Sequence, residues 1–323
     1  MVSRTHWRIG AVLMLAAGSI ALAAPAEPPA WAYPMPTPQA ALPGADDKGP
    51  QHVPDSAAAY TRAQLDDLFS APDWHPQDHG PMPAVVAQGR KPEVMACGYC
   101  HRPDGAGGPE NARLAGLPFG YILQQLADFK SGARRSALPA RTPQALMVKL
   151  SKHLEEADAR AAAAYFARLA PRRAITVRES DTVPRTFAPG WFLAPADGGA
   201  REPIGRRIIE VPEDTADFER RDARATFIAY VPPGSLAWGA AIAAGAAPGR
   251  TPRCATCHGA GLRGQGNVPG IAGRSPSYLV RQLHDIRVGV RRGQAAQAMK
   301  GIAARLDADD MLAVAAYVAS LEP

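Results

Sequence analysis

Apolar residues at helical spacing are the main signal in this chain, and they predict a mostly helical fold. The clearest run lies near the C-terminus and comprises Leu306, Val314, Val318 and Leu321. This spacing places the four side chains on one face of a helix. Asp307 and Asp310 at its start form the pattern of a capping box, in which side chains bond the free N–H groups of the first turn.

Two more helices are predicted just upstream of the cysteines, and two strands in the middle of the chain. The helix candidates span residues 83–89 and 236–245, with Ser235 as the N-cap of the second. The segments "RRIIEVPEDT" (206–215) and "RATFIAYVPPG" (224–234) have the alternating or β-branched character of strands. The middle of the chain is therefore expected to be irregular or β.

The first 70 residues have the character of export and linker sequence. Arg4 and Arg8 precede an apolar run, residues 9–22, that ends in small residues, which is typical of a secretory signal peptide over residues 1–24. The run is shorter than the ~20 residues of a membrane span, so an uncleaved N-terminal anchor is the weaker alternative. Residues 25–70 are rich in proline and alanine and predict a flexible or extended leader. We therefore expect a periplasmic protein.

An internal repeat divides the rest of the chain into two similar halves. The segment "YILQQLADFKSGARR", which starts at Tyr121, aligns without gaps with "YLVRQLHDIRVGVRR", which starts at Tyr278. A second pair of segments aligns downstream of it. We therefore predict an all-α protein of two equivalent domains, residues 71–170 and 235–323, joined by a long, partly irregular or β connector over residues 171–234.

The four cysteines of the chain lie in two identical motifs. "CGYCH" holds Cys97, Cys100 and His101, and "CATCH" holds Cys254, Cys257 and His258. Four cysteines in an exported protein would by default form disulfides. The spacing of the cysteines argues against that default, and the histidine after each pair is not a feature of a thioredoxin-like redox pair. The absence of a strand pattern before either motif argues against the redox pair of a thioredoxin.

Cys-x-x-Cys-His is the attachment motif of haem c. On a helix, a three-residue step places both sulfurs on one face, where they can bond to the edge of one planar macrocycle while the next residue ligates iron. We therefore predict two covalently attached haem c groups. The alternative is a zinc site, but it would need motifs 157 residues apart to converge on one ion.

A methionine at a matching place in each half is the predicted second iron ligand. Met147 lies 46 residues after His101, and Met299 lies 41 residues after His258. A methionine is more often a core residue, but its recurrence in both repeats favours a ligand, and thioether sulfur raises the reduction potential of a haem. Five extra residues before Met147 leave His153 as an alternative ligand in the first half.

Other polar residues have two interpretations. His75 and His79 could bind a metal but are expected in a solvated loop, and His284 is expected on the solvated face of its helix. Four arginines could pair with haem propionates, because guanidinium matches carboxylate geometry, or could be exposed charges at helix ends. They are Arg134, Arg135, Arg291 and Arg292.

The distribution of charge indicates the kind of partner. The 323 residues carry a formal net charge of +6, and the excess of Lys and Arg lies on the two cysteine-bearing segments. A redox donor and a redox acceptor with acidic docking surfaces are therefore expected as partners, one of which could belong to a membrane-bound complex. Nucleic acid is not an expected partner of an exported chain.

Taken together, the motifs resemble those of dihaem class I cytochromes c of the cytochrome c4 type. The resemblance covers residues 80–170 and 235–323 and rests on Cys-x-x-Cys-His, on "YxxxQLxDxxxGxRR" and on the methionine before "LxxxDxxxxAAYxxxL". It implies a few helices packed round each haem, and electron transfer in the periplasm. The second half keeps a proline that such families place near the histidine, Pro269, whereas the first half has none at the matching position.

We expect an electron carrier between a donor dehydrogenase or quinol-oxidising complex and a terminal oxidase or reductase. The protein would tune the potential of each haem through its axial ligands and its burial. A dihaem peroxidase is the alternative from the enzyme class, but it would need one haem with a free position and therefore unequal ligands in the two halves. A cytochrome subunit of a dehydrogenase complex is the third alternative.

Overall fold

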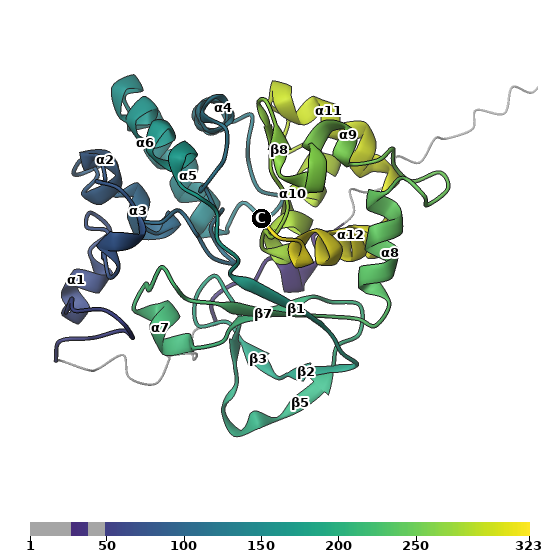
Figure 1. Cartoon of the computed structure of the whole chain (residues 1–323), viewed down its shortest axis with the longest axis horizontal. Helices are drawn as coiled ribbons and strands as arrows, with labels where there is room; N and C mark the ends of the chain where they lie inside the picture. The colour runs from purple at the N-terminus through teal and green to yellow at the C-terminus, as the bar shows by residue number, and fades with distance from the viewer. Residues whose placement is uncertain (1–26, 38–48) are drawn as a thin grey trace, which may run out of the picture.

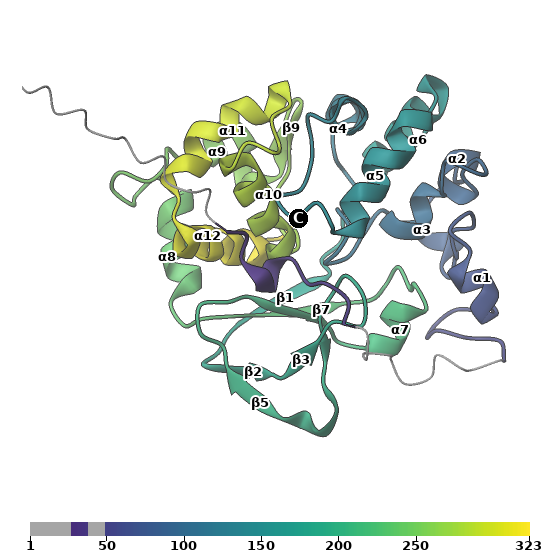
Figure 2. The ribbon, with the colours of Figure 1, turned by 180° about the vertical axis from the view of Figure 1, so that it is seen from behind.

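The computed structural model describes residues 27–37 and 49–323. Two groups of helices lie side by side, and small β-sheets lie beneath them (Figure 1). The view from behind shows the same three parts (Figure 2). The protein is therefore mostly helical but not all-α, and the sheets lie where the sequence predicted a β or irregular connector.

The first group of helices belongs to the first cysteine motif. It comprises α1 (Arg62–Asp66), α2 (Ala84–Ala87), α3 (Cys97–His101), α4 (Phe119–Ser131), α5 (Thr142–His153) and α6 (Glu156–Arg168). The helix predicted over residues 83–89 is the short α2. Val86, Ile122 and Phe166 from α2, α4 and α6 pack in one buried cluster. α4 stops at Gly132, whose φ of 72° is one that glycine adopts without strain.

The second group of helices belongs to the second cysteine motif. It comprises α8 (Ser235–Ala243), α9 (Ala255–His258), α10 (Pro276–Arg287), α11 (Gln294–Arg305) and α12 (Ala308–Ser320), with the short turn η4 (Ala260–Leu262) and the hairpin of β8 (Gly264–Gln265) and β9 (Val268–Pro269). α8 packs closely on α12, since a Cβ on Gly239 would lie 2.0 Å from the Ala313 carbonyl oxygen. Only glycine permits this approach.

Of the two helix starts predicted in this half, one is confirmed and one is wrong. Asp307 and Asp310 form the predicted capping box at the start of α12. The prediction of Ser235 as an N-cap is wrong, because Gly234 with a φ of 83° occupies that position and Ser235 is the first residue of α8. A left-handed residue before the helix is not visible in a pattern of side chains.

The middle of the chain forms small sheets, as the strand patterns predicted. Its strands are β1 (Ile175–Glu179), β2 (Thr182–Pro184), β3 (Thr186–Phe187), β4 (Ala194–Pro195), β5 (Arg201–Pro203), β6 (Ile209–Pro212) and β7 (Phe227–Val231), with the turn η3 (Asp197–Gly199) and the helix α7 (Thr215–Glu219). β7 is central in the largest sheet, parallel to β1 and antiparallel to β6, and β2–β5 and β3–β4 form two-stranded ladders. Phe218 and Phe227 from this part share a buried cluster with Val280 and Leu312 of the second group.

The described part of the Pro/Ala-rich leader is packed rather than free. Residues 30–32 form the turn η1 (Ala30–Ala32), and Tyr33 beyond it is 2% exposed and donates a hydrogen bond to Asp285 Oδ1 at 2.9 Å. Val53 and Leu65 pack in a small buried cluster with Trp74. These residues include the turn η1 and the helix α1 and belong to the folded core, so they do not form the flexible or extended leader that the composition predicts.

The predicted signal peptide, residues 1–24, lies outside the described residues. Within residues 27–37 and 49–323, no helix has both the length and the apolar character of a membrane span.

Candidate haem sites

Each Cys-x-x-Cys-His motif forms a short helix. Cys97 and Cys100 lie on α3, which ends at His101. In the second half, Cys254 is the N-cap of α9, which ends at His258. The helical step of three residues brings the two sulfurs of each motif to one face, as the sequence predicted.

Both histidines are anchored through the same ring nitrogen. His101 Nδ1 donates to the Ala112 carbonyl oxygen at 2.8 Å, and His258 Nδ1 donates to the Pro269 carbonyl oxygen at 2.9 Å. Because a carbonyl only accepts, Nδ1 carries the proton and the lone pair of Nε2 is left for a metal. Ala112 and Pro269 are equivalent in the repeat, so the first half orients its histidine without the proline.

The burial of the two histidines and of the Cys97 thiol favours haem over zinc. Burial lowers the pKa of His101 and of His258, which keeps both rings in the neutral form that binds metals. Burial also raises the pKa of Cys97 to about 12, which disfavours the thiolate that zinc requires. Within the described parts of the chain, no three His, Cys, Asp or Glu side chains are grouped to hold an ion, so the zinc alternative gains no support.

A cavity of about 340 Å³ lies against α3. Cys97, Cys100 and His101 line it together with Met147 of α5. The rest of its wall is largely apolar and includes Ile122, Leu126, Phe166, Trp191, Phe192 and Phe218. An apolar cavity with two thiols, a free imidazole nitrogen and a thioether sulfur fits haem c.

The predicted methionine ligands receive unequal support from the structure. Met147 shares the cavity with His101, whereas His153 is about half exposed and lies 3.9 Å from Glu93. Met299 lies on α11 against a small buried cluster of Ile286, Ala296 and Ala303. This cavity does not reach His258 or Met299, so their pairing continues to rest on the repeat.

A second, smaller cavity of about 90 Å³ runs from His101 and Met147 toward the other half of the molecule. Its far wall includes Arg134, Tyr278 and Gln282. These residues belong to a polar cluster that joins the halves, which we call the interdomain clasp. The clasp consists of Tyr121, Gln125, Arg134, Tyr278, Gln282 and Arg291.

The clasp has the symmetry of the repeat. Arg134 donates to Gln125 at 2.9 Å, to Gln282 at 3.0 Å and across the interface to Tyr278 Oη at 3.0 Å. Arg291, its equivalent, donates to Gln282 at 3.0 Å, to Gln125 at 2.9 Å and across the interface to Tyr121 Oη at 2.9 Å. The backbones of the two arginines pair as an antiparallel bridge. Equivalent residues therefore hold the two halves in one relative position.

The four arginines of the sequence analysis fall into two pairs. Arg134 and Arg291 lie in the clasp, and the Nε atom of each is buried with no partner among the described residues. No carboxylate oxygen bonds either guanidinium in these contacts, so the pair has unused capacity for an anionic group such as a haem propionate. Arg135 and Arg292 are exposed. Arg134 and Arg291 thus suit the interpretation as propionate partners, and Arg135 and Arg292 suit the interpretation as exposed charges.

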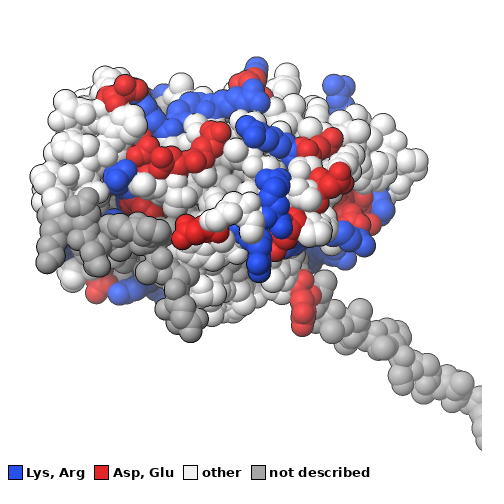
Figure 3. Space-filling view, turned by 90° about the horizontal axis from the view of Figure 1, so that it is seen from below, with Lys and Arg blue, Asp and Glu red and all other residues white. Residues whose placement is uncertain are grey.

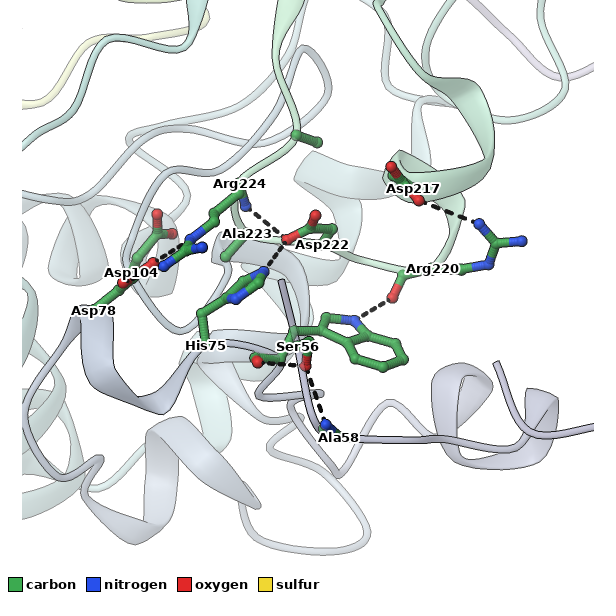
Figure 4. Close-up of polar contacts among 12 residues, drawn as sticks. Ser56, Ala58, His75, Asp78, Asp104, Asp217, Arg220, Asp222, Ala223 and Arg224 are labelled. Atoms are coloured by element: carbon green, nitrogen blue, oxygen red, sulfur yellow. Dashed lines mark hydrogen bonds and ion pairs between the residues drawn. The ribbon is translucent and has the colours of Figure 1, made fainter. Parts of the chain in front are cut away.

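The predictions for three other histidines need correction. His284 is buried rather than solvated, 5% exposed, with its ring edge-on to Tyr33. His75 is also buried rather than in a solvated loop, and its Nε2 lies 3.0 Å from Asp222 Oδ1 of the connector (Figure 4). His79 is partly buried and bonds Asp73 at 3.1 Å. For His75 and His284, a segment distant in sequence covers the side chain, which a local pattern does not reveal.

Sequence reasoning also missed residues that shape the sites. Tyr121, Gln125, Tyr278 and Gln282 recur in the repeat, and this recurrence was a signal that they share a role. Nothing in the local sequence pointed to Trp191 and the residues near Phe218, which the connector places in the first cavity.

The chain is similar to a known protein family and to several known proteins. The family model for cytochrome c matches residues 241–322. The thiosulfate dehydrogenase electron acceptor of Stutzerimonas stutzeri (strain A1501) is 30% identical over 236 residues, 72% of this chain and 82% of that protein. Cytochrome c4 of Azotobacter vinelandii is 26% identical over 250 residues, 75% of this chain and 91% of that protein.

Among solved structures, the thiosulfate dehydrogenase (TsdBA) from Marichromatium purpuratum is 28% identical, with a TM-score of 0.47, over 73% of this chain and 38% of that chain. The similarity to the two curated relatives extends well beyond the residues that the family model matches.

Proposed function

Because this chain belongs to the dihaem cytochromes c, together with cytochrome c4 and the thiosulfate dehydrogenase electron acceptors, we propose that it accepts electrons from a dehydrogenase that oxidises thiosulfate or a related sulfur compound. It delivers them to a terminal oxidase or reductase. The observation that carries the proposal is the 30% identity to an electron acceptor of thiosulfate dehydrogenase over 82% of its length.

The residues assigned to the two sites are equivalent in the repeat. We propose that Cys97 and Cys100, and likewise Cys254 and Cys257, attach one haem each. The iron ligands are His101 with Met147 and His258 with Met299. When bound, the group supplies an iron that alternates between Fe(III) and Fe(II). With both axial positions taken by side chains, the protein acts as a carrier and not as a peroxidase.

The chain's own residues prepare these sites. The Ala112 and Pro269 carbonyls fix the ring orientation of the two histidines, and burial keeps both rings neutral. The interdomain clasp keeps the two sites at a constant separation. We propose on this basis that domains over residues 71–170 and 235–323 carry the sites, with residues 171–234 as the connector.

The proposal places the protein in the periplasm. Residues 1–24 act as the signal peptide, and Arg4 and Arg8 before the apolar run support this assignment. Covalent haem attachment to four otherwise free cysteines is consistent with maturation in that compartment.

The first experiment counts haem groups. The protein is produced in a periplasm with the haem attachment machinery, and covalent haem per chain is determined by absorption of the alkaline pyridine complex and by mass spectrometry. Two haems are expected. The double variants C97S/C100S and C254S/C257S should each retain one, which makes them matched controls for one another.

The second experiment identifies the donor. Reduction of the oxidised protein is followed at the haem absorption bands after mixing with a thiosulfate dehydrogenase and thiosulfate, or with a quinol-oxidising complex and quinol. Faster reduction by the dehydrogenase is expected. Reduction by the quinol-oxidising complex alone would contradict the proposed donor and leave the carrier role intact.

A further inference from the structure

The two Cys-x-x-Cys-His motifs differ in how much of their surface is accessible. No residue from Glu93 to Ala115 in the first half is exposed. In the equivalent stretch of the second half, residues 250–272, ten residues are exposed. The exposed positions are Pro252, Arg253, Thr256, Cys257, Ala260, Gly261, Arg263, Gln265, Gly266 and Asn267. The same part of the repeat is therefore closed in one half and open in the other.

The connector and the segment before the first motif close the first surface. The Arg221 guanidinium lies 4.0 Å from the ring centre of Tyr99, which is 4% exposed. Arg102, next to His101, donates to the Phe218 carbonyl oxygen at 3.2 Å. The position equivalent to Tyr99 in the second half is Thr256, and no part of the connector covers it.

The open surface also carries positive charge that no acidic residue of this half offsets. Arg253 and Arg263 are exposed and form no ion pair with any described residue. The acidic residues of this half are engaged elsewhere: Asp285 is buried, Asp307 and Asp310 pair with Arg250, Asp309 with Arg206 and Glu322 with Arg173.

On the side of the molecule that the sheets occupy, positive and negative side chains are mixed and many are paired. Seen from below, Lys and Arg side chains are interspersed with Asp and Glu (Figure 3). Pairs such as Arg224 with Asp78, at 2.7 Å, connect the connector to the first half. A mixed surface of this kind does not attract a partner of one charge sign.

We propose that a redox protein with an acidic docking face binds the open surface around Arg253, Thr256, Cys257 and Arg263, and that the covered first motif is not a docking surface. Transient redox complexes have small interfaces and do not need an extended docking surface. The arginines accelerate the encounter, while contact beside Cys257 brings the partner close to the second site. This inference rests on the proposed carrier function.

The first test maps anion docking directly. The reduced, haem-loaded protein, labelled with ¹⁵N, is titrated with hexacyanochromate(III), a paramagnetic anion that broadens nearby amide signals. Broadening is expected at residues 253–263 and not at residues 96–106. Broadening centred on the first motif, or spread evenly over the surface, would overturn the proposal.

The second test measures encounter with a protein partner. The rate constant for reduction by thiosulfate dehydrogenase should fall about tenfold at low salt in R253E/R263E, because two positive charges become negative at the docking surface. Arg253→Lys should retain the rate. The single variants R253E and R263E should each show part of this fall, and their control is Arg178→Glu on β1, an exposed arginine outside the surface that undergoes the same change of charge.

The outcomes separate this proposal from the proposed function. If reduction is equally fast in the wild type and in R253E/R263E, with both haems present, the proposed docking surface is refuted and the proposed function is unaffected. If the dehydrogenase does not reduce the protein but hexacyanochromate(III) still localises to residues 253–263, the proposed donor is refuted and the proposed docking surface is supported.

Discussion

The helices α3 and α9 carry the same motif in two different surroundings. α3 lies under the connector and the N-terminal segment, and its cavity wall contains Trp191, Phe192 and Phe218 from outside its own half. α9 is covered mainly by its own half, where Cys254 and Leu262 pack with Ile242 of α8 and Met311 of α12. The repeat thus specifies the cysteine motif of each half, whereas the segments outside the repeat specify what covers it.

The match to the cytochrome c family also differs between the two halves. The cytochrome c model matches only residues 241–322, in the half whose surroundings are its own. The first half has the motif, the equivalent tyrosine and the arginine of the clasp, but it has no proline at the position of Pro269 and has five more residues before Met147. Its site therefore depends on contacts that the second site does not need.

The largest predicted effect concerns the sixth iron ligand of each half. Met147→Ala should leave the iron of the first site open, so that one of two reduced haems binds carbon monoxide and its reduction potential falls. Met299→Ala should do the same at the second site. Absorption spectra of the reduced protein with and without carbon monoxide, together with a redox titration, measure both effects.

The matched control is the unmutated protein, in which neither haem should bind carbon monoxide. Full binding at the first site before any mutation would show that no side chain holds its sixth position. If instead Met147→Ala leaves the first haem closed to carbon monoxide, Met147 is not its ligand, and His153→Ala then tests the alternative.

Removal of a connector side chain should destabilise the covered site. Phe218 is 3% exposed and packs edge-on to Phe192 and Phe227, so Phe218→Ala should lower the free energy of unfolding by about 3 to 5 kcal/mol. Denaturation of the haem-loaded protein, followed at the haem bands, measures the loss. Phe119→Ala removes the same group from an exposed position and should cost less than about 1 kcal/mol. Equal effects would refute the role given to the connector.

Disruption of the clasp should affect the two halves equally. Arg134→Leu leaves acceptors on Gln125, Gln282 and Tyr278 without one of their donors and should cost about 1 to 3 kcal/mol. Arg291→Leu should cost a similar amount.

Because both arginines bond both glutamines, the effects of Arg134→Leu and Arg291→Leu should not add in the double variant. A double-mutant cycle on unfolding free energies tests this. Arg292→Leu, at an exposed position, is the control. Strict additivity would mean that the clasp is not one network.

The smallest predicted effect depends on pH and belongs to the first half alone. The hydrogen bond to Asp73 raises the pKa of His79. The folded pKa therefore exceeds the unfolded value, and the resulting stabilisation is full below about pH 6.5 and is lost as the pH rises through the folded pKa. His79→Gln should lower the unfolding free energy at about pH 5.5 and have little effect at about pH 9. A loss that is the same at both pH values would contradict this assignment.

The sequence predicted the chemistry of the sites better than their surroundings. Both cysteine motifs, the repeat, the capping box of Asp307 and the strands around Ile209 and Phe227 follow from patterns within a few residues or from self-similarity. The environments of His75 and His284 did not follow, because the residues that cover them, Asp222 and Tyr33, are far away in the chain. Spacing along a helix indicates a face, but it does not tell what packs on that face.

The sequence by itself determined that two haem c groups attach in equivalent places, because the attachment chemistry needs two sulfurs and a histidine within one helical turn. Only the tertiary structure decided that these equivalent places are unequal: the connector covers Tyr99 of one motif and leaves Thr256 of the other exposed. The physical reason is the separation along the chain between the residues involved. The covalent attachment of a haem is set by neighbours in the chain, whereas access to the motif is set by segments that folding brings from more than a hundred residues away.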